Sequence, residues 1–294
     1  MKHRCNQQHI AGLNNSKHPS SLFMKVGLFV PCYVNQFYPQ VGIATLELLE
    51  KLGCKVDYPL QQTCCGQPMA NSGYEKLTGA CNELFTKNFA AYDFIVCPSG
   101  SCVLHIKEHL HSEKNGLAAT TISQNIFELT EFLTDILKVG AIPARFPHKV
   151  GLHQSCHGQR GLHLSQMSEL VAPPYSKPEK LLKMVDGLEL VSPSRKDECC
   201  GFGGTFCVFE EAVSVKMGKD RVRDHEEHGA EFITGVDMSC LMHLEGILKR
   251  QKSIVQVRHI AEILNQGWAV DENPSLRQFK SKREADLINR EIES

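Results

Sequence analysis

Apolar and polar positions alternate along the first half of the chain as they do in strands followed by helices. A continuous apolar run over residues 25–31 predicts a buried strand, because strands covered on both faces lack polar alternation. An amphipathic helix is predicted over 40–52, with Gly53 as its stop. We then predict a short strand over 54–58, a long helix over 72–91 and a third strand over 94–97.

The second half repeats this alternation. We predict strands over 150–153, 188–191, 232–236 and 254–256, and helices near 158–166, 178–185, 209–228, 240–250 and 259–265. A further helix is predicted over 125–138, in the link between the halves. The pattern indicates an α/β fold of two pseudo-symmetric, Rossmann-like parallel-sheet domains over 24–140 and 148–265. Residues 1–23 are expected to be a disordered or non-native extension, and 266–294 a charged tail.

Composition narrows the class of protein. The 294 residues are 42% hydrophobic and 22% charged, with a formal net charge of −1, so the basic excess of a nucleic-acid-binding protein is missing. No apolar run reaches the roughly 18 residues of a membrane span, and residues 1–23 lack the apolar core of a secretory signal. Any membrane association would come through partners. The 13 cysteines therefore indicate a reducing, cytoplasmic setting, where grouped thiols bind metals or do redox chemistry.

Eight of the cysteines fall into two sets with the same order. The first set comprises Cys32, Cys64, Cys65 and Cys102, and the second comprises Cys156, Cys199, Cys200 and Cys240. Members of each set follow the first, second and third predicted strands of their half, so parallel strands would bring four thiols to one sheet edge. A glycine, Gly66 or Gly201, follows each Cys-Cys pair and would let the backbone approach a bulky inorganic group.

Thiol sets of this kind bind soft metals. Adjacent cysteines meet the geometry of a disulfide poorly, whereas thiolates select zinc, copper(I) and iron–sulfur clusters. Four cysteines are the usual complement of a cluster. Structural zinc is the main alternative, although zinc sites usually use pairs two to four residues apart, and neither Cys-Cys-Gly run is such a pair. Buried structural thiols are a second alternative.

The doubled motif carries a resemblance to a known family. Cys64-Cys65-Gly66 and Cys199-Cys200-Gly201, each between two single cysteines, are similar to the tandem cysteine-rich CCG domains of the heterodisulfide reductase-like family. Within that family, residues 24–32, 98–102 and 199–204 resemble the lactate utilization protein A subfamily. The resemblance extends over about 24–265.

This resemblance implies a function, a cofactor and partners. The chain would be an iron–sulfur electron-transfer subunit of an oxidoreductase complex that converts L-lactate to pyruvate. Each of the two cysteine sets would hold a [4Fe-4S]-type cluster. The partners would be a ferredoxin-like iron–sulfur subunit and a third lactate-utilization subunit, with a small hydroxy acid as the substrate of the complex and no nucleic acid.

Two other functions stay open. The heterodisulfide reductase relatives imply thiol–disulfide reduction at a non-cubane cluster held by five cysteines. Ser99 and Asp237 stand where the first cysteine of each terminal Cys-x-x-Cys pair would be, which counts against that cluster. The other alternative is a zinc-stabilised scaffold that only organises its partners. No residue is assigned to catalysis.

Several histidines lie near the cysteine sets in the sequence. His153 and His157 flank Cys156 and could donate a hydrogen bond to sulfur or move a proton. His243 and His105 follow Cys240 and Cys102 by one helical turn, which would place them beside the sites. For His105, however, the neighbouring His109 and His111 on a charged helix favour a solvated surface.

Other polar and thiol side chains are expected to be structural. Arg221 and Arg223 could bind a substrate carboxylate, but nearby acids favour surface ion pairs. Asp237 could be an oxygen ligand, but a capping carboxylate on a surface loop is the favoured interpretation. Among the remaining cysteines, Cys54, Cys81 and Cys97 are predicted to be core thiols. Cys5 falls in the N-terminal extension, and Cys207 is a weak further candidate for the second site.

Overall fold

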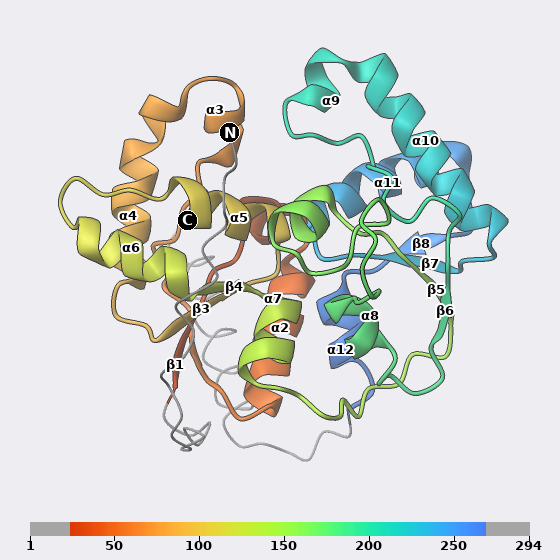
Figure 1. The fold of residues 1–294 in the computed structure, drawn as a ribbon, viewed down its shortest axis with the longest axis horizontal. Coiled ribbons are helices and arrows are strands. Elements are labelled where there is room, and N and C mark those ends of the chain that lie inside the picture. Colours follow the sequence, from red (N-terminus) through yellow and green to blue (C-terminus); the bar gives the residue numbers. More distant parts are fainter. Residues whose placement is uncertain (1–23, 269–294) are drawn as a thin grey trace, which may run out of the picture.

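A computed structural model describes residues 24–268 and shows two parallel sheets side by side (Figure 1). The strand order is β2-β1-β3-β4 in the first sheet and β6-β5-β7-β8 in the second, with every neighbouring pair parallel. Helices flank both sheets, so the predicted α/β class is confirmed. The expected extension over 1–23, with Cys5, and the tail beyond residue 268 lie outside the described residues.

The first half contains β1 to β4 and the helices around them. Its strands are β1 (Lys25–Leu28), β2 (Lys55–Asp57), β3 (Phe94–Cys97) and β4 (Ile126–Glu128). Its helices are α1 (Cys32–Phe37), α2 (Pro39–Lys51), α3 (Gln67–Asn71), α4 (Gly79–Phe89), α5 (Gly100–His109), α6 (Gly116–Asn125) and α7 (Leu129–Glu131), with short helical turns η2 (Glu75–Thr78) and η3 (Phe132–Ile136).

The second half has the same plan. Its strands are β5 (Lys149–Leu152), β6 (Glu189–Val191), β7 (Phe232–Thr234) and β8 (Gln256–Val257). Its helices are α8 (Lys177–Leu182), α9 (Phe206–Phe209), α10 (Glu211–Glu227), α11 (Met238–Gln251) and α12 (Ile260–Asn265), with the helical turn η4 (His157–Gly161).

The central strands of the two sheets have the same sequence and the same pairing. β1 and β5 are both Lys-Val-Gly-Leu. Val26 of β1 lies opposite Phe94, and Val150 of β5 lies opposite Phe232. The halves can therefore be matched residue by residue from these strands into the loops that follow them.

The predicted helix over 125–138 is wrong at its start. Ile126–Glu128 forms β4, which pairs with β3 through Ile95 and Ile126. The buried Glu128 side chain then caps α7 by accepting hydrogen bonds from Thr130 and Glu131 amides, at 2.7 and 3.3 Å. Three residues are too few to interrupt a helical apolar period, so the pattern concealed the strand.

Two other predicted helices are also altered. The helix predicted over 72–91 begins only at Gly79, as α4; before it, α3 ends at Asn71, the chain turns at Gly73, which has a positive φ of 84°, and η2 follows. The helix near 158–166 is only the five-residue π-helical turn η4, which ends at Gly161. The chain cannot continue as a helix because His163 takes a positive φ of 53°, and Gly161 fits where a side chain would collide with Leu104 of the first half.

The two halves share one hydrophobic core. α2 of the first half packs against α12 of the second, as Figure 1 shows, and α5 packs against η4. Around the apolar contact, Lys51 donates to Asn265 Oδ1 at 2.7 Å and Asn265 donates to Glu47 at 2.8 Å. Buried apolar side chains form a continuous cluster across both sheets. The halves are therefore a single packed unit.

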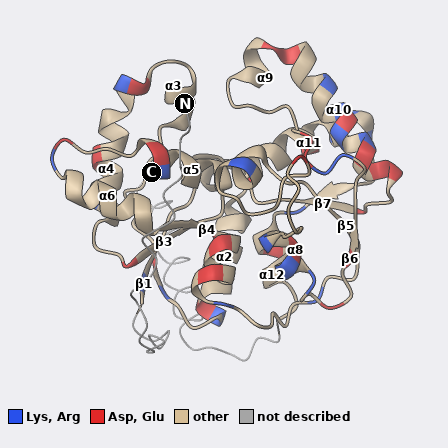
Figure 2. Cartoon of the chain, in the orientation of Figure 1, with Lys and Arg blue, Asp and Glu red and all other residues tan. Residues whose placement is uncertain are grey.

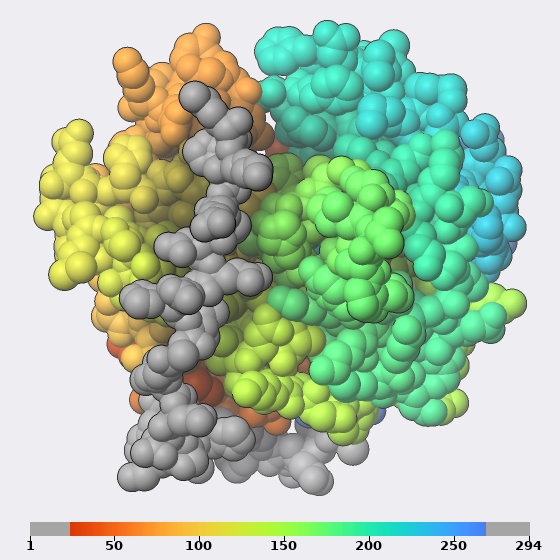
Figure 3. Space-filling view, in the orientation of Figure 1, coloured from red at the N-terminus to blue at the C-terminus, as the bar shows by residue number. Residues whose placement is uncertain are grey.

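Charge is unevenly distributed over the helices. Figure 2 shows acidic and basic residues along α10, whereas α3 and α9 contain none. In Figure 3 the orange surface of α3 and α4 lies next to the blue-green surface of α9 and α10 at the upper edge. Among helices within 24–268, none is both long and apolar enough to cross a membrane.

Candidate metal-binding site

The predicted cysteine sets occupy equivalent places in the two halves. Cys32 begins α1, Cys64 and Cys65 lie between β2 and α3, and Cys102 is in the first turn of α5. Cys156 precedes η4, Cys199 and Cys200 lie between β6 and α9, and Cys240 is in the first turn of α11. All eight thiols line one open cleft between the halves, with an empty volume of about 810 Å³. The carboxyl ends of both sheets thus face a common space.

The first set is arranged as two close pairs of sulfurs. The Sγ atoms of Cys32 and Cys64 are 3.8 Å apart, and those of Cys65 and Cys102 are 3.6 Å apart. The Gly66 amide donates to Cys64 Sγ at 3.4 Å, which the positive φ of Gly66, 93°, makes possible. Hydrogen bonding from the Cys32 thiol lowers the pKa of Cys64 to about 2, while it raises the pKa of Cys32.

The second set repeats this arrangement. The Gly201 amide donates to Cys199 Sγ at 3.4 Å, and Gly201 again has a positive φ, 88°. Hydrogen bonding from the Cys156 thiol lowers the pKa of Cys199 to about 2, and hydrogen bonds to its neighbouring thiols raise the pKa of Cys200. Each set therefore favours one thiolate, the form in which cysteine binds metals.

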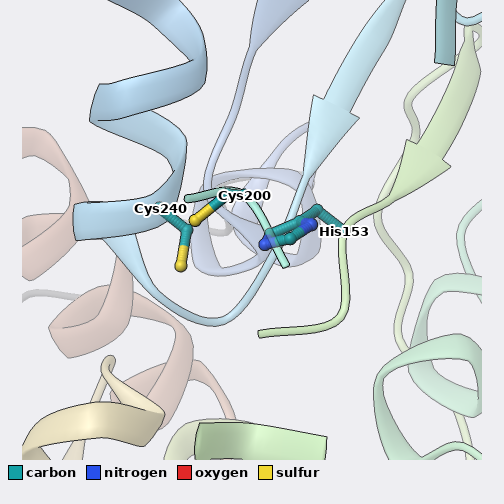
Figure 4. Close-up of side chains that lie close together, drawn as sticks. All are labelled: His153, Cys200 and Cys240. Atoms are coloured by element: carbon teal, nitrogen blue, oxygen red, sulfur yellow. The ribbon is translucent and has the colours of Figure 1, made fainter. Parts of the chain in front are cut away.

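The spread of the sulfurs bears on what the sets could hold. A single tetrahedral zinc with bonds of about 2.3 Å needs every pair of its sulfurs roughly 3.8 Å apart. Within the described part of the chain, the one group of three donor atoms all within 4.8 Å of one another is formed by His153, Cys200 and Cys240 (Figure 4). The four sulfurs of the first set thus form two close pairs and are not arranged around a single ion. They fit a larger, multinuclear group better.

Each site is bordered by a residue from the opposite half. Tyr33, next to Cys32, makes an edge-to-face contact with Phe202, next to Gly201, with ring centroids 5.9 Å apart. At the corresponding place, His157 lies with its Nε2 3.5 Å from Nε2 of Gln67, the residue after Gly66. The pseudo-symmetry therefore applies to the contacts between the halves as well as to the strands.

Asp237 is not the surface carboxylate that the sequence predicts, because its side chain is only 1% exposed. Ser99 and Asp237 form an antiparallel bridge between the halves, and Ser99 Oγ donates to Asp237 Oδ1 at 2.8 Å. The Ser101 amide donates to the same oxygen at 2.9 Å, and Ser155 Oγ donates to Oδ2 at 2.5 Å. Asp237 thus caps α5 of the opposite half. Ser99 and Asp237, the two positions at which relatives are expected to have a fifth cysteine, are hydrogen-bonded to each other.

Arg221 contradicts its predicted surface role. Its side chain is fully buried, with Nε donating to His153 Nδ1 at 3.2 Å, Nη1 to the Arg195 carbonyl at 2.6 Å and Nη2 to the Leu152 carbonyl at 3.4 Å. Asp224, also buried, accepts from Arg221 at 3.4 Å. Arg223 does lie on the surface, where it pairs with Asp220 at 2.8 Å. The local charge pattern could not separate the two arginines.

The remaining histidines lie behind the cysteine loops. His105 is buried, contrary to the prediction of a solvated side chain, and burial lowers its pKa to about 4. It stacks on the exposed His109 and forms a hydrogen bond to the Cys65 backbone. His243 lies 3.3 Å from the Ser214 carbonyl, and burial lowers its pKa. His105 thus contacts the first Cys-Cys-Gly loop, and His243 contacts α10 and the Phe202 ring.

The cysteines outside the two sets differ in burial. Cys54 and Cys97 are core thiols, as predicted. Cys81 is half-buried, so it is less enclosed than expected. Cys207 is half-buried on α9 and donates to the Gly204 carbonyl at 3.0 Å.

Two domains with these thiol sets define a tandem cysteine-rich α/β protein. The sequence matches the family "CCG: Cysteine-rich domain" twice, over residues 26–107 and 150–245. The chain belongs to this family, as its Cys-Cys-Gly motifs predicted.

Curated relatives cover most of the chain. It is 41% identical over 248 residues to lactate utilization protein A 1 of Bacillus mycoides, which spans 83% of this chain and 97% of that protein. It is 42% identical over 251 residues to lactate utilization protein A of Geobacillus kaustophilus, covering 82% and 99%. A solved hypothetical protein of Helicobacter pylori shares the fold, with a TM-score of 0.54 and 13% identity over 82% of this chain and 48% of that one.

Proposed function

We propose that the chain is the iron–sulfur electron-transfer subunit of a complex that oxidises L-lactate to pyruvate. The observation that carries the proposal is that two four-thiol sets line one cleft. The chain is also about 40% identical to lactate utilization protein A over nearly the whole length of those relatives. Iron–sulfur clusters would supply one-electron transfer there. The free thiols suit the reducing conditions of the cytoplasm, where we place the complex.

The proposed ligands are the eight thiols of the two sets. Cys32, Cys64, Cys65 and Cys102 would hold one [4Fe-4S]-type cluster, and Cys156, Cys199, Cys200 and Cys240 the other. The paired but unclosed sulfurs of the first set support a group larger than one zinc ion. The chain's own part is to present thiolates, to donate backbone amides to sulfur and to keep the two sites facing each other.

The lining of the cleft supports oxidation of the hydroxy acid in a partner subunit. Among the described residues, its side chains are thiols, apolar groups, uncharged polar groups, His157 and the acidic Asp237. A lactate carboxylate would need an arginine or lysine for strong binding. We therefore propose that electrons reach this chain from a partner, with a ferredoxin-like iron–sulfur subunit and a third lactate-utilization subunit completing the complex.

Disulfide reduction at a five-cysteine cluster is a weaker hypothesis for this chain. The positions at which the additional ligand is expected are Ser99 and Asp237, which bond to each other inside the interface. A cluster that used them would have to displace a buried hydrogen bond. The proposed sites therefore use four thiols each.

Metal analysis of anaerobically purified protein tests the proposal. We expect about four irons and four sulfides per site, two sites per chain, and lactate-dependent cluster reduction only when the partner subunits are present. Cys65→Ser and Cys200→Ser should each remove the iron of one site, whereas Cys54→Ser, a core thiol outside both sets, should retain it. Stoichiometric zinc without sulfide would overturn the proposal in favour of a zinc-stabilised scaffold.

A further inference from the structure

The two sites differ in the residue that follows the central strand. After the identical Lys-Val-Gly-Leu strands, the first half has Phe29 and the second has His153. Phe29 packs edge-to-face against Phe85 and Phe89, with ring centroids 4.9 and 5.8 Å away. His153 instead receives a hydrogen bond from Arg221. An apolar position behind the first site thus corresponds to a polar one behind the second.

The Arg221 contact determines the tautomer of His153. A guanidinium group only donates hydrogen bonds, so His153 Nδ1, which faces Arg221 Nε at 3.2 Å, must accept. The neutral ring then carries its proton on Nε2. His153 therefore presents an N–H group on its far side.

That N–H group points toward the second cysteine set. Figure 4 shows the ring nitrogen far from the backbone directed at Cys200 and Cys240, and donor atoms of the three residues lie within 4.8 Å of one another. Nε2 is buried without a hydrogen-bond partner in the protein. Leaving a buried donor unsatisfied is unfavourable, so the site requires an acceptor at this point.

We infer that His153 donates its Nε2–H to sulfur at the second site, so that this site has the higher reduction potential of the two. The inference rests on the iron–sulfur function proposed above. A donor to sulfur stabilises the reduced, more negative state of a cluster and thereby raises its potential. The same geometry makes His153 a hydrogen-bond donor and not a metal ligand, because its Nδ1 lone pair is already used.

Other contacts strengthen the difference between the sites. At the second site, the Phe202 amide donates to Cys200 Sγ at 3.5 Å, and His157 Nδ1 lies 3.7 Å from Cys156 Sγ. The residue of the first half that corresponds to His157 is Tyr33, whose ring contacts Phe202. Nitrogen groups close to sulfur, from the backbone and from side chains, are therefore more numerous at the second site, and an electron shared by the two sites resides mainly there.

An anaerobic redox titration followed by EPR tests the inference. Cys65→Ser and Cys200→Ser variants, each retaining one site, would assign the signals. In the wild type we expect the second site to be reduced first. The His153→Phe variant has the residue found at the equivalent position of the first half. At the midpoint potential of the wild-type second site, its ratio of reduced to oxidised cluster should be lower by about tenfold or more. His153→Gln, which keeps an N–H donor, should restore much of it.

Metal content separates the possible failures. Protein without iron and sulfide would refute the proposed function itself. A His153→Phe variant with full iron and an unchanged potential would overturn only the present inference, as would earlier reduction of the first site. If that variant loses iron, pulsed EPR of His157→Phe protein labelled with ¹⁵N-histidine decides: because this variant lacks the histidine beside Cys156, a histidine nitrogen coupled to the reduced second site supports the His153 donor, and its absence refutes it.

Discussion

The layers behind the two cysteine sets are chemically opposite although the strands in front of them are alike. In the first half the layer is aromatic, formed by Phe29, Phe85 and Phe89. In the second half the corresponding layer is polar, formed by His153, Arg221 and His225. The equivalence is seen at the glycines of the central strands: the Phe89 ring lies against Gly27, and the His225 ring lies against Gly151.

This comparison separates what the topology fixes from what the side chains adjust. Parallel strands bring the thiols to one sheet edge whatever lies behind them. The layer behind then sets the polarity and the donors around each site. One fold can therefore hold two similar thiol sets in different electrostatic surroundings. The following predictions test that contrast in order of decreasing effect.

Removal of a ring from the aromatic layer should have the largest effect. Phe85 is almost fully buried between Phe29 and Phe89, so Phe85→Ala leaves a cavity and should lower the free energy of unfolding by about 4 kcal/mol. Urea denaturation measures this. Phe37→Ala, at an exposed position, is the control and should change it by less than about 0.5 kcal/mol.

Removal of the charge from the polar layer should cost somewhat less. Arg221→Met keeps the length of the side chain but leaves two backbone carbonyls and His153 Nδ1 without their donor, so we expect a loss of about 3 kcal/mol. Arg223→Met, the same change on the exposed face of α10, should have little effect. Equal stabilities of the two variants would contradict the buried role of Arg221.

Removal of the bridge between the halves should lower the free energy of unfolding by about 2 kcal/mol. Asp237→Ala leaves the hydroxyl groups of Ser99 and Ser155 and the Ser101 amide without their acceptor inside the interface. Asp186→Ala, which removes an exposed carboxylate, serves as the matched control. Both are compared with the wild type by urea unfolding, and an unaltered midpoint for Asp237→Ala would show that the bridge does not stabilise the interface.

The smallest effect is a pH dependence specific to the polar layer. Burial lowers the pKa of His225 to about 2, so the folded protein keeps this ring neutral while the unfolded chain takes up a proton below about 6.5. Stability is thus unaffected by this group above pH 6.5 and falls by about 1 kcal/mol per pH unit below it. His225→Phe, which imitates Phe89, should make unfolding between pH 6.5 and 5 less acid-sensitive, whereas an equal slope would exclude His225 as a source.

The sequence was sufficient for the features that depend on local pattern and topology. Apolar runs identified the central strands, and the order of the cysteines predicted that four thiols of each half would meet at one edge. The sequence could not reveal partners distant in the chain. Arg221 looks like a surface residue among Asp220 and Asp224 until its contact with His153, 68 residues away, is known.

The duplication did not mark Arg221 as buried either. Aligning the halves on their Cys-Cys-Gly motifs places Asp220, and not Arg221, opposite the core residue Phe85. Asp237 offered no sign of its burial, because the acceptor role of its side chain depends on Ser99, 138 residues earlier. The short strand β4 was missed for a third reason, since three residues carry too little periodicity.

The packing of α12 on α2 has a consequence for biosynthesis. α2 buries Val41, Leu48 and Leu49, and its partner α12 lies more than two hundred residues later, near the end of the described chain. On a ribosome, synthesis runs from the amino end, so the apolar face of α2 stays uncovered until the second half has emerged as far as α12. The first half is therefore synthesised first, but its core is fully covered only when α12 of the second half is available. The length of the second half sets the time during which the exposed face of α2 could aggregate.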